Sequence, residues 1–516
     1  MRVLTASDRA MLIEAADLAE AMRVNVRLGD IPGIVERVPG ARTVLVRFDP
    51  LRTSADAIAA AVASGTADAE PPSPTREVVL PVRYDGEDLE ETARMLSVSP
   101  EELVRRHLAA EWTVAFSGFA PGFGYAVSGD PLFDVPRRST PRTRVPAGSV
   151  GLAGVFSGVY PRESPGGWQL IGRTDTVMWD IDRDPPALLS PGTGVRFERA
   201  DREVVRSGGG VRTPRRAEAD DPRPRTPCVE VVRPALQLLV QDAGRTGFAA
   251  LGVSSSGAAD RRALHDANRA VGNAPTAAVL ECVGSAVLRL HGSGVAVITG
   301  AEGELELVTA DGGARPIAHG VPFATSEGDE LHLGHPERGI RYVIGVRGGV
   351  AAASVLGSRA TDTLAGLGPA PLVAGDVVGV GRDVAGSVEE GVSPRALPAT
   401  GEVVELPITL GPRDDWFTPA ALDALVSQDW LVTPRSDRVG VRLQGDRPLE
   451  RAITGELPSE GAVAGALQVP PDGQPVLFGP DHPVTGGYPI IAALTDAALD
   501  TSGQLPPGAR IRFRAV

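Results

Sequence analysis

Two pairs of an acid and an arginine have the residue types needed to bind an anion. Asp437 directly precedes Arg438, and Asp242 stands three positions before Arg245. A carboxylate can hold a neighbouring guanidinium group in place, so that its N–H groups orient a carboxylate or phosphate ligand. The same spacing also suits a structural ion pair at a turn. Both pairs are therefore candidates for a binding or catalytic site.

Three further side chains could exchange protons or bind a metal ion. Glu460 and Asp481 stand beside glycine or proline, where they could act as acids and bases or cap turns. His107 falls near the end of a helix predicted over residues 100–110, where an imidazole could act in catalysis or bind free carbonyl groups. The sequence has no HExxH, no cluster of His and Cys and no G-x-S-x-G, so no metal ligand is assigned.

Glycine-rich loops form a third group of candidates, because their backbone N–H groups can converge on an anion. The glycines assigned to this role are Gly118, Gly122, Gly148, Gly166, Gly167, Gly486 and Gly487. The chain has only five tyrosines, and Tyr125, Tyr160 and Tyr488 lie inside these loops. A rigid amphipathic ring suits the wall of a cleft, although tight turns at barrel corners would also account for the glycines. Together with Arg173, these residues make up the predicted substrate or anion site.

The sequence contains no lysine, so all 51 basic residues are arginine. This excludes a P-loop lysine, a Schiff-base lysine and a covalently attached biotin from this chain. A phosphate bound here would need arginine, backbone N–H groups or a metal ion. The net charge of −14 argues against nucleic acid or an anionic membrane as a partner, because both bind basic surfaces.

Nothing in the sequence indicates membrane insertion or export. No apolar run reaches the roughly 18 residues that a membrane helix requires. Residues 1–22 carry acidic groups throughout and lack the cleavage site of a signal peptide. Cys228 and Cys282 are the only cysteines and cannot form a disulfide framework. We therefore expect a cytoplasmic protein.

The composition predicts a mostly β protein. The 61 glycines and 45 prolines, with aromatic residues at 4%, favour short strands and tight turns. Near the N-terminus, helices are predicted over 8–22 and 54–64, and strands over 24–28 and 43–48. The predicted domains are a small α+β domain at 1–75, a β-barrel at 76–200, a disordered linker at 201–227, and two β-rich barrel domains at 228–400 and 401–516.

A faint internal repeat suggests that two of these domains are related. Val145-Pro146 precedes the paired glycines Gly166-Gly167 by some twenty residues, and Val469-Pro470 precedes Gly486-Gly487 in the same way. In both places an aromatic residue and an aliphatic strand follow the glycines. We infer two related barrels, one on each side of the linker.

Several motifs follow one another in residues 1–200, namely His107–Trp112, Gly118–Tyr125, Val145–Val150, Gly158–Pro161, Ser164–Trp168 and Ile171–Thr174. In their combination and order they resemble the KipI family. A second series follows in residues 228–516, namely Val240–Phe248, Ser256–Asp260, Ala267–Asn273, Ser436–Gly440, Ser459–Gly461, Gln468–Pro470 and Gly486–Pro489. This series resembles the partner family KipA.

The chain is thus identified as a fused member of the KipI–KipA family. This family includes the B and C subunits of 5-oxoprolinase, related to allophanate hydrolase subunits 1 and 2, and the carboxyltransferase part of urea amidolyase. The resemblance implies a ferredoxin-like N-terminal domain followed by cyclophilin-like β-barrel domains, that is, a mostly β fold with α+β parts. Two motifs depart from the family pattern: Phe156-Ser157 replaces Gln-Thr, and Pro483-Val484 replaces Gln-Thr after Asp481. The first departure removes an amide, and the second removes an amide and a hydroxyl, which bears on the substrate.

The leading functional interpretation is an enzyme component formed by the fused B and C subunits of an ATP-dependent 5-oxoprolinase. The resemblance implies that it converts 5-oxoproline to glutamate with ATP, Mg²⁺ and a separate A-type subunit of the LamB/YcsF family. One alternative is the carboxyltransferase component of a biotin-dependent urea carboxylase, and another is a non-enzymatic regulator of a histidine kinase. In the leading interpretation, both segments should shape one anion-binding cleft from glycine turns and guanidinium groups.

Overall fold

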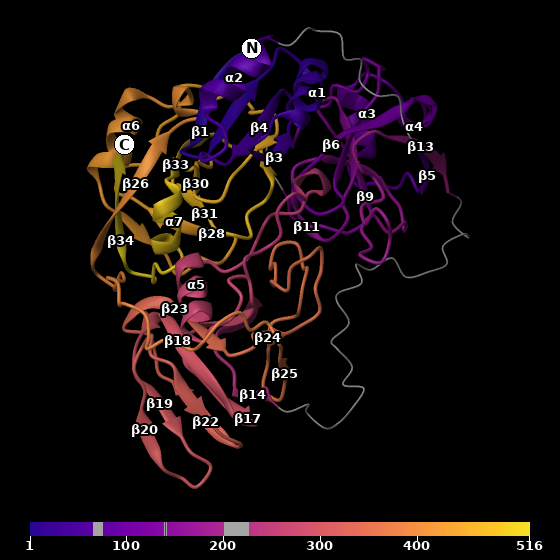
Figure 1. Ribbon diagram of the computed structural model, residues 1–516. Coiled ribbons are helices and arrows are strands. Elements are labelled where there is room, and N and C mark those ends of the chain that lie inside the picture. Colours follow the sequence, from indigo (N-terminus) through magenta and orange to yellow (C-terminus); the bar gives the residue numbers. More distant parts are fainter. Residues whose placement is uncertain (65–75, 139, 141, 201–226) are drawn as a thin grey trace.

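The computed structural model describes residues 1–64, 76–138, 140, 142–200 and 227–516. The linker predicted at 201–227 lies outside the described residues, except for Pro227, and so does the end of the predicted α+β domain, residues 65–75. Among the described residues, no helix is long and apolar enough to cross a membrane. We name the four parts the N-terminal domain (1–64), the first barrel (76–200), the middle domain (227–400) and the second barrel (401–516) (Figure 1).

The N-terminal domain is a four-stranded antiparallel sheet covered by two helices. Its elements are β1 (Arg2–Ser7), β2 (Ala10–Glu14), α1 (Leu18–Arg27), β3 (Ile34–Pro39), β4 (Thr43–Phe48) and α2 (Ala55–Ser64). The strand order is β1-β2-β4-β3. The run β2-α1-β3-β4-α2 follows the ferredoxin-like order, and β1 takes the edge position beside β2 that a strand after α2 would otherwise fill. The expected ferredoxin-like arrangement is therefore present with its edge strand at the start of the chain.

The helix predicted over 8–22 and the strand predicted over 24–28 are wrong. Residues Ala10–Glu14 form β2, and α1 begins only at Leu18, where the Asp17 side chain accepts a hydrogen bond from Glu20 N at 2.8 Å. The reason is that β2 is covered on both faces, so it lacks the alternation of polar and apolar residues that marks a half-exposed strand.

The first barrel is built from a strongly curved sheet of order β12-β9-β10-β7-β6-β13-β5. A bridge between Arg83 and Arg173 connects its two edges, just beyond β5 and at the end of β12. Ser99 caps α4 by accepting from Glu102 N at 3.2 Å, and Ser and Glu three positions apart are the sequence pattern of a capping box. The elements are β5 (Arg76–Val82), α3 (Leu89–Met95), α4 (Pro100–Ala109), β6 (Trp112–Ser117), β7 (Gly124–Val127), β8 (Arg142–Val145), β9 (Ser149–Ala153), β10 (Phe156–Val159), β11 (Ser164–Gly166), β12 (Gln169–Arg173) and β13 (Thr193–Arg199).

The second barrel is closed and has the same strand order as the first. Starting from a parallel pair, the first barrel runs β5-β13-β6-β7-β10-β9-β12 and the second runs β26-β34-β27-β28-β31-β30-β33. The elements are β26 (Val403–Leu410), α6 (Pro419–Ser427), β27 (Trp430–Val432), β28 (Gly440–Gln444), β29 (Glu460–Gly461), β30 (Ala466–Gln468), β31 (Val476–Phe478), β32 (Thr485–Gly486), β33 (Ile490–Leu494), α7 (Asp496–Ser502) and β34 (Arg510–Ala515).

This shared order agrees with the two related barrels inferred from the repeat, with one change of alignment. The paired glycines precede the equivalent strands β12 and β33. Val145-Pro146, however, lies before β9, whereas Val469-Pro470 lies before β31, which is the equivalent of β10. The similarity of the two Val-Pro turns is therefore a coincidence of composition, whereas that of the glycine turns reflects equivalent positions.

The middle domain consists of two sheets around one core, where the sequence predicted a barrel. The sheet orders are β20-β19-β22-β17-β14-β25-β24 and β15-β16-β23-β18-β21, and both sheets contribute residues to one apolar cluster. The elements are β14 (Cys228–Arg233), β15 (Gln237–Gln241), α5 (Arg261–Ala270), β16 (Val279–Val283), β17 (Ala286–His291), β18 (Gly294–Glu302), β19 (Leu305–Val308), β20 (Ala314–Pro316), β21 (Phe323–Thr325), β22 (Asp329–Leu333), β23 (Arg338–Val346), β24 (Val350–Ala351) and β25 (Val377–Val380).

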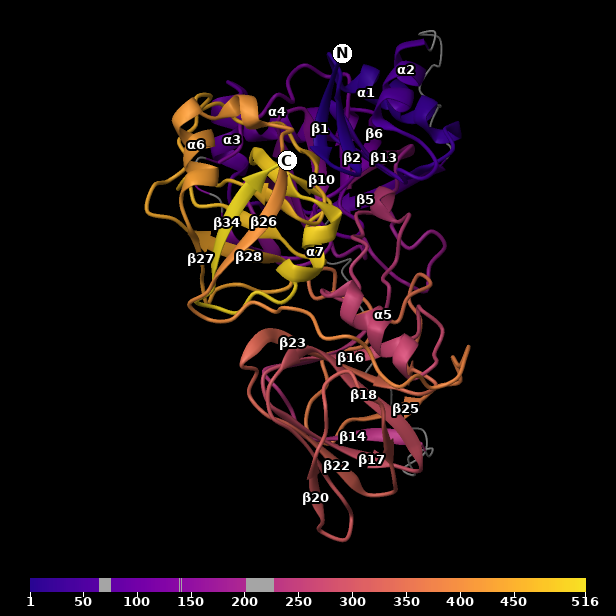
Figure 2. The same ribbon diagram turned by 60° about the vertical axis from the view of Figure 1, so that its left-hand side comes forward.

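The N-terminal domain packs against the second barrel, which is the most distant part of the chain in sequence. Successive side chains of a strand point to opposite faces: Met11 and Ile13 pack under α1 and α2, while Leu12 and Leu45 pack against the second barrel. Figures 1 and 2 show the N-terminal domain beside the second barrel in both views. The position of this domain therefore brings residues from both ends of the chain together.

Candidate functional site

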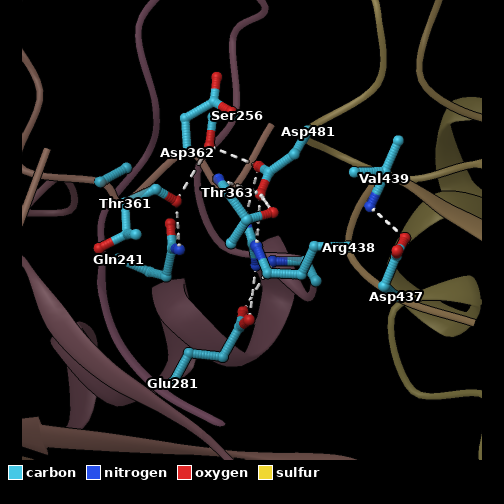
Figure 3. Close-up of polar contacts among 12 residues, drawn as sticks. Gln241, Ser256, Glu281, Thr361, Asp362, Thr363, Asp437, Arg438, Val439 and Asp481 are labelled. Atoms are coloured by element: carbon cyan, nitrogen blue, oxygen red, sulfur yellow. Dashed lines mark hydrogen bonds and ion pairs between the residues drawn. The ribbon is translucent and has the colours of Figure 1, made fainter. Parts of the chain in front are cut away.

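A fully buried cluster of charged side chains lies where the second barrel meets the middle domain. Arg438 lies two residues before β28, and its guanidinium group binds Asp481 through Nε at 2.9 Å and Nη2 at 3.0 Å (Figure 3). Both side chains are 0% exposed. Nη1 binds Glu281 of β16 at 2.5 Å, and Nη2 also donates to Gly257 O at 2.6 Å. One arginine thus connects two carboxylates from different domains.

In this cluster, the arginine and the carboxylates each stabilise the charged form of the other. Burial alone would lower the pKa of Arg438, but Asp481 and Glu281 hold it above its ordinary value, so the guanidinium stays charged. Burial would likewise raise the pKa of Asp481, but Arg438 outweighs it and the pKa is lowered. Asp481 also accepts from Ser256 Oγ at 2.6 Å and Thr363 N at 2.9 Å, both in the middle domain.

A second carboxyl group near Asp481 has a raised pKa. Burial, followed by the charge of Asp481, raises the pKa of Asp362 to about 6. Asp362 accepts from Ser254 Oγ at 3.0 Å and from Ala365 N at 2.7 Å. The pKa values of these two neighbouring carboxyl groups are therefore shifted in opposite directions.

A cavity of about 290 Å³ opens beside this cluster, at the junction of three parts of the chain. The N-terminal domain contributes Arg9, Glu36 and Arg47 to its lining. The remaining polar residues of the lining include Ser254, Ser255, Ser256, Arg261 and Arg341 from the middle domain, and Asp437, Arg438, His482 and Asp496 from the second barrel. Of the residues predicted from the sequence, only Asp437 and Arg438 reach this cavity.

The two predicted pairs of acid and arginine are not pairs in the structure. Asp437 is exposed and caps its own turn, accepting from Val439 N at 2.9 Å and Gly440 N at 3.0 Å, and it points away from Arg438 (Figure 3). Asp242 accepts from Ser358 Oγ at 2.6 Å. Arg245 donates to the carbonyl groups of Val355 and Ala360, and burial lowers its pKa. Asp242 and Arg245 thus stabilise loops of the middle domain.

Glu460 connects the second barrel to the N-terminal domain. Its carboxylate binds Arg413 at 2.8 Å and 3.0 Å, and Arg413 also binds Glu14 of β2 at 2.9 Å. Burial raises the pKa of Glu460 even though Arg413 opposes it. The group lies outside the cavity lining, so its contacts are those of a domain connection.

His107 lies inside the first barrel, away from the cavity lining. Its side chain is buried between Trp112 and Phe197, with Nδ1 2.8 Å from Tyr84 Oη and Nε2 3.0 Å from Ser157 Oγ. Burial lowers its pKa to about 3. Ser157, one of the two departures from the family pattern, thus satisfies a core histidine.

Some of the predicted glycine turns meet along the seam between the two barrels. Phe119 N, next to Gly118, donates to Thr485 Oγ1 at 2.9 Å. Gly487 lies against Arg137 of the first barrel, which donates to Ser459 Oγ at 3.0 Å. Gly486 pairs with Glu460 between β32 and β29.

Other predicted binding residues have local structural contacts. Gly148 has a φ of +78°, and a Cβ there would lie 2.1 Å from Thr174 O, so only glycine fits. Tyr160 is buried, and its hydroxyl lies so close to Gly166 that a Cβ there would be 2.2 Å away. The contacts of the remaining predicted residues are Tyr125 stacked on Phe116 at 4.4 Å, Gly122 N donating to Leu251 O at 3.0 Å, Gly167 O accepting from Arg138 N at 2.8 Å, Arg173 paired with Asp85 on the surface, and Tyr488 under Arg451 at 5.7 Å.

The expected single cleft of glycine turns and guanidinium groups is therefore wrong. The glycine turns lie along the barrel seam or inside the first barrel, whereas the guanidinium groups of Arg438 and its neighbours lie at the cavity. Sequence reasoning missed Glu281, Ser256 and Thr363 as members of the buried cluster. Among the described residues, no group of three or more His, Cys, Asp or Glu side chains could hold a metal ion.

Family comparisons match both parts of the chain. A model described as carboxyltransferase domain, subdomain C and D, matches residues 1–189, and one described as carboxyltransferase domain, subdomain A and B, matches residues 251–515. The B subunit of 5-oxoprolinase from Escherichia coli O157:H7 is 42% identical over 181 residues, which cover 34% of this chain and 82% of that protein. The C subunit of 5-oxoprolinase from E. coli K12 is 35% identical over 290 residues, which cover 55% of this chain and 90% of that protein.

Two further comparisons extend this result. The crystal structure of TTHA0988 is 33% identical, covers 98% of this chain and 99% of that chain, and has a TM-score of 0.83. The urea amidolyase of Lachancea kluyveri is 31% identical over 317 residues, which cover 56% of this chain but only 17% of that enzyme. One chain thus combines a region similar to the B subunit with a region similar to the C subunit, which confirms the fusion inferred from the sequence.

Proposed function

Since the chain belongs to the carboxyltransferase-domain family, with subdomains C and D preceding subdomains A and B, we propose that it supplies the fused B and C parts of an ATP-dependent 5-oxoprolinase. The complete enzyme would include a separate protein of the LamB/YcsF type. The supporting observation is that most of the B subunit and most of the C subunit, 82% and 90% of their lengths, are matched in one chain.

The reaction would open the lactam ring of 5-oxoproline. An amide is a poor electrophile, and phosphoryl transfer from ATP to the lactam oxygen makes that oxygen a leaving group. Attack by one water and cleavage of the ring C–N bond would give the acyl phosphate of glutamate and a free amine. A second water would then hydrolyse this acyl phosphate to glutamate and phosphate, with ADP left from the first step. Because the described residues contain no cluster of three metal ligands, we assign no metal ion to this chain's own side chains. ATP and Mg²⁺ would enter with the assembled complex.

What the chain's own residues would contribute is a preorganised polar wall. Arg438 is fixed by Asp481 and Glu281, so its charge does not have to reorganise when a ligand enters the neighbouring cavity. Asp362 lies behind this wall, where it accepts from the lining residue Ser254, and its raised pKa of about 6 would let it bind a proton in mildly acidic solution. The cavity walls come from both the B-like and the C-like region of the chain.

Reconstitution tests this proposal. The purified chain is mixed with a candidate LamB/YcsF-type protein, ATP, Mg²⁺ and 5-oxoproline, and glutamate and phosphate are measured. We expect both products in equal amounts, and only when both proteins are present. A mixture that hydrolyses no 5-oxoproline, while a bacterial B–C pair restores activity to the same LamB/YcsF-type protein, would refute the proposal.

A second candidate is the carboxyltransferase component of a urea carboxylase. It is favoured by the family description and by the similarity to urea amidolyase. Because this sequence has no lysine, the carboxylated biotin would have to be attached outside it. Transfer of carboxyl groups from a biotinylated carrier to urea, without any LamB/YcsF-type protein, would support this candidate instead.

A further inference from the structure

His482 is a buried residue of the cavity wall with no assigned role. It follows β31 and lies next to Asp481, and it is 7% exposed. Its ring stacks on Phe478 with the centroids 5.8 Å apart and the planes inclined by 12°. Because Phe478 belongs to β31 and also lines the cavity, the ring is held by the barrel rather than by a loose loop.

The hydrogen bonds of His482 determine its tautomer. Nδ1 lies 2.9 Å from the carbonyl oxygen of Pro483. A carbonyl oxygen can only accept, so the proton resides on Nδ1 and the lone pair on Nε2. Nε2 has no hydrogen-bond partner among the described residues. It is not among the fully buried polar atoms without a partner in this part of the chain, so it is accessible from open space. His482 lines the cavity, and we infer that Nε2 meets the cavity.

The surroundings keep the ring neutral. Burial is the main cause that lowers the pKa of His482, to about 4, and Arg47 lowers it further while Asp481 opposes this effect. Neither charged neighbour satisfies Nε2: Arg47 binds Glu36 at 3.0 Å, and Asp481 binds Arg438. Nε2 therefore receives no hydrogen bond from the described residues, and a ligand with an N–H or O–H donor would bind it in place of water.

We propose that the junction cavity binds a small molecule with an N–H group beside a carbonyl, as in an amide, a lactam or urea, and that Nε2 of His482 accepts the hydrogen bond from this N–H. The choice of ligand class rests on the proposed function, since both candidate substrates share this group. A cavity of about 290 Å³ suits a molecule of this size. The sequence departs from its family's pattern right after this residue, at Pro483-Val484, and it is the Pro483 carbonyl that fixes the tautomer.

The first test observes the histidine directly and needs neither ATP nor a partner protein. The seven histidines are labelled with ¹⁵N, and His482 is assigned by its loss in His482→Ala. We expect a neutral ring with an unprotonated Nε2 at pH 7, and a shift of the Nε2 resonance on adding 5-oxoproline or urea. A protonated Nε2, or no shift with either compound at saturating concentration, would overturn the inference.

The second test measures affinity by calorimetry with the same two compounds. His482→Ala should weaken binding about three- to tenfold, the effect of one hydrogen bond, while His335→Ala, at an exposed histidine outside the cavity lining, should bind as the native protein does. Equal affinity of all three proteins would overturn the inference. Binding of urea but not of 5-oxoproline would support the cavity chemistry and contradict the 5-oxoprolinase proposal. Failed glutamate formation together with intact lactam binding would place the failure in the reconstituted reaction.

Discussion

Replacing Asp481 by Asn tests whether the buried ion pair holds the second barrel and the middle domain together. Asp481 receives hydrogen bonds from two nitrogens of Arg438, from Ser256 Oγ, and from both N and Oγ1 of Thr363. Every one of these partners is a donor. An Asn side chain has only one oxygen, so its amide nitrogen would face donors and Arg438 would lose one of its two counter-charges.

The magnitude follows from what remains in place. Removing one partner of a buried pair costs about 3–5 kcal/mol, because the other charge is left without compensation. Here Glu281 still binds Arg438 at 2.5 Å, so we expect the lower end, about 3 kcal/mol. For folded units of this size, each kcal/mol shifts the melting temperature by about 2–4 °C. Asp481→Asn should therefore lower the melting temperature of these two units by about 6–12 °C.

Calorimetry with Asp437→Asn as the matched control measures this effect. Asp437 is close in sequence to the same arginine but exposed, and Asn can still accept from Val439 N and Gly440 N. Its substitution should cost less than about 0.5 kcal/mol. Hydrogen exchange should also accelerate at Thr363, whose amide loses its acceptor. If both variants melted at the same temperature, the ion pair would contribute no net stability and our reasoning would be wrong.

Three other contacts give predictions of their own. Gly118→Ala should destabilise the barrel seam by about 1–3 kcal/mol, because a Cβ would lie 2.2 Å from Thr485 Oγ1, and calorimetry should show partial rescue by Thr485→Ala. Glu460→Gln should cost about 3 kcal/mol in equilibrium urea denaturation, because it removes one of the two carboxylates of Arg413. His107 titrates at about 3 when folded and near 6.5 when unfolded, so protonation of the unfolded chain should lower stability by about 1.4 kcal/mol per pH unit as the pH falls below 6.5. Unfolding curves at several pH values should therefore show a flatter slope for His107→Gln.

The sequence predicts an element correctly where that element depends on contacts between residues close together in the chain. The capping box at Ser99 and Glu102 predicts the start of α4, because both groups lie within one helical turn. The same reasoning failed for residues 10–14, which were predicted as helix and form a strand. This strand is covered by helices on one face and, on the other, by a barrel that begins only at residue 401, so its burial pattern has no period that the sequence could display.

In the candidate site, too, local sequence predicts some residues but not the distant partners that they bind. Arg438 and Asp481 could be predicted as charged groups beside turns, but their partner Glu281 lies 157 positions from Arg438 in an apolar strand. Nothing near Glu281 in the sequence distinguishes it from a surface residue of a half-buried strand. The role proposed for His482 depends on its hydrogen bond to the Pro483 carbonyl oxygen and on the cavity walls that other domains supply. Neither can be predicted from the position of His482 in the sequence.

The cavity depends on the second barrel, because the other two parts that line it, the N-terminal domain and the middle domain, are attached to this barrel through buried arginines. Arg438 binds Glu281 of the middle domain, and Arg413 binds Glu14 of the N-terminal domain. Since the cavity lining draws on all three parts, loss of either connection would remove a wall. Planar guanidinium groups suit this role, since each can bind carboxylates from two directions at once, which the single ammonium group of lysine does less specifically. Joining the two regions in one chain adds no contact to these connections, but it raises the effective concentration at which they form.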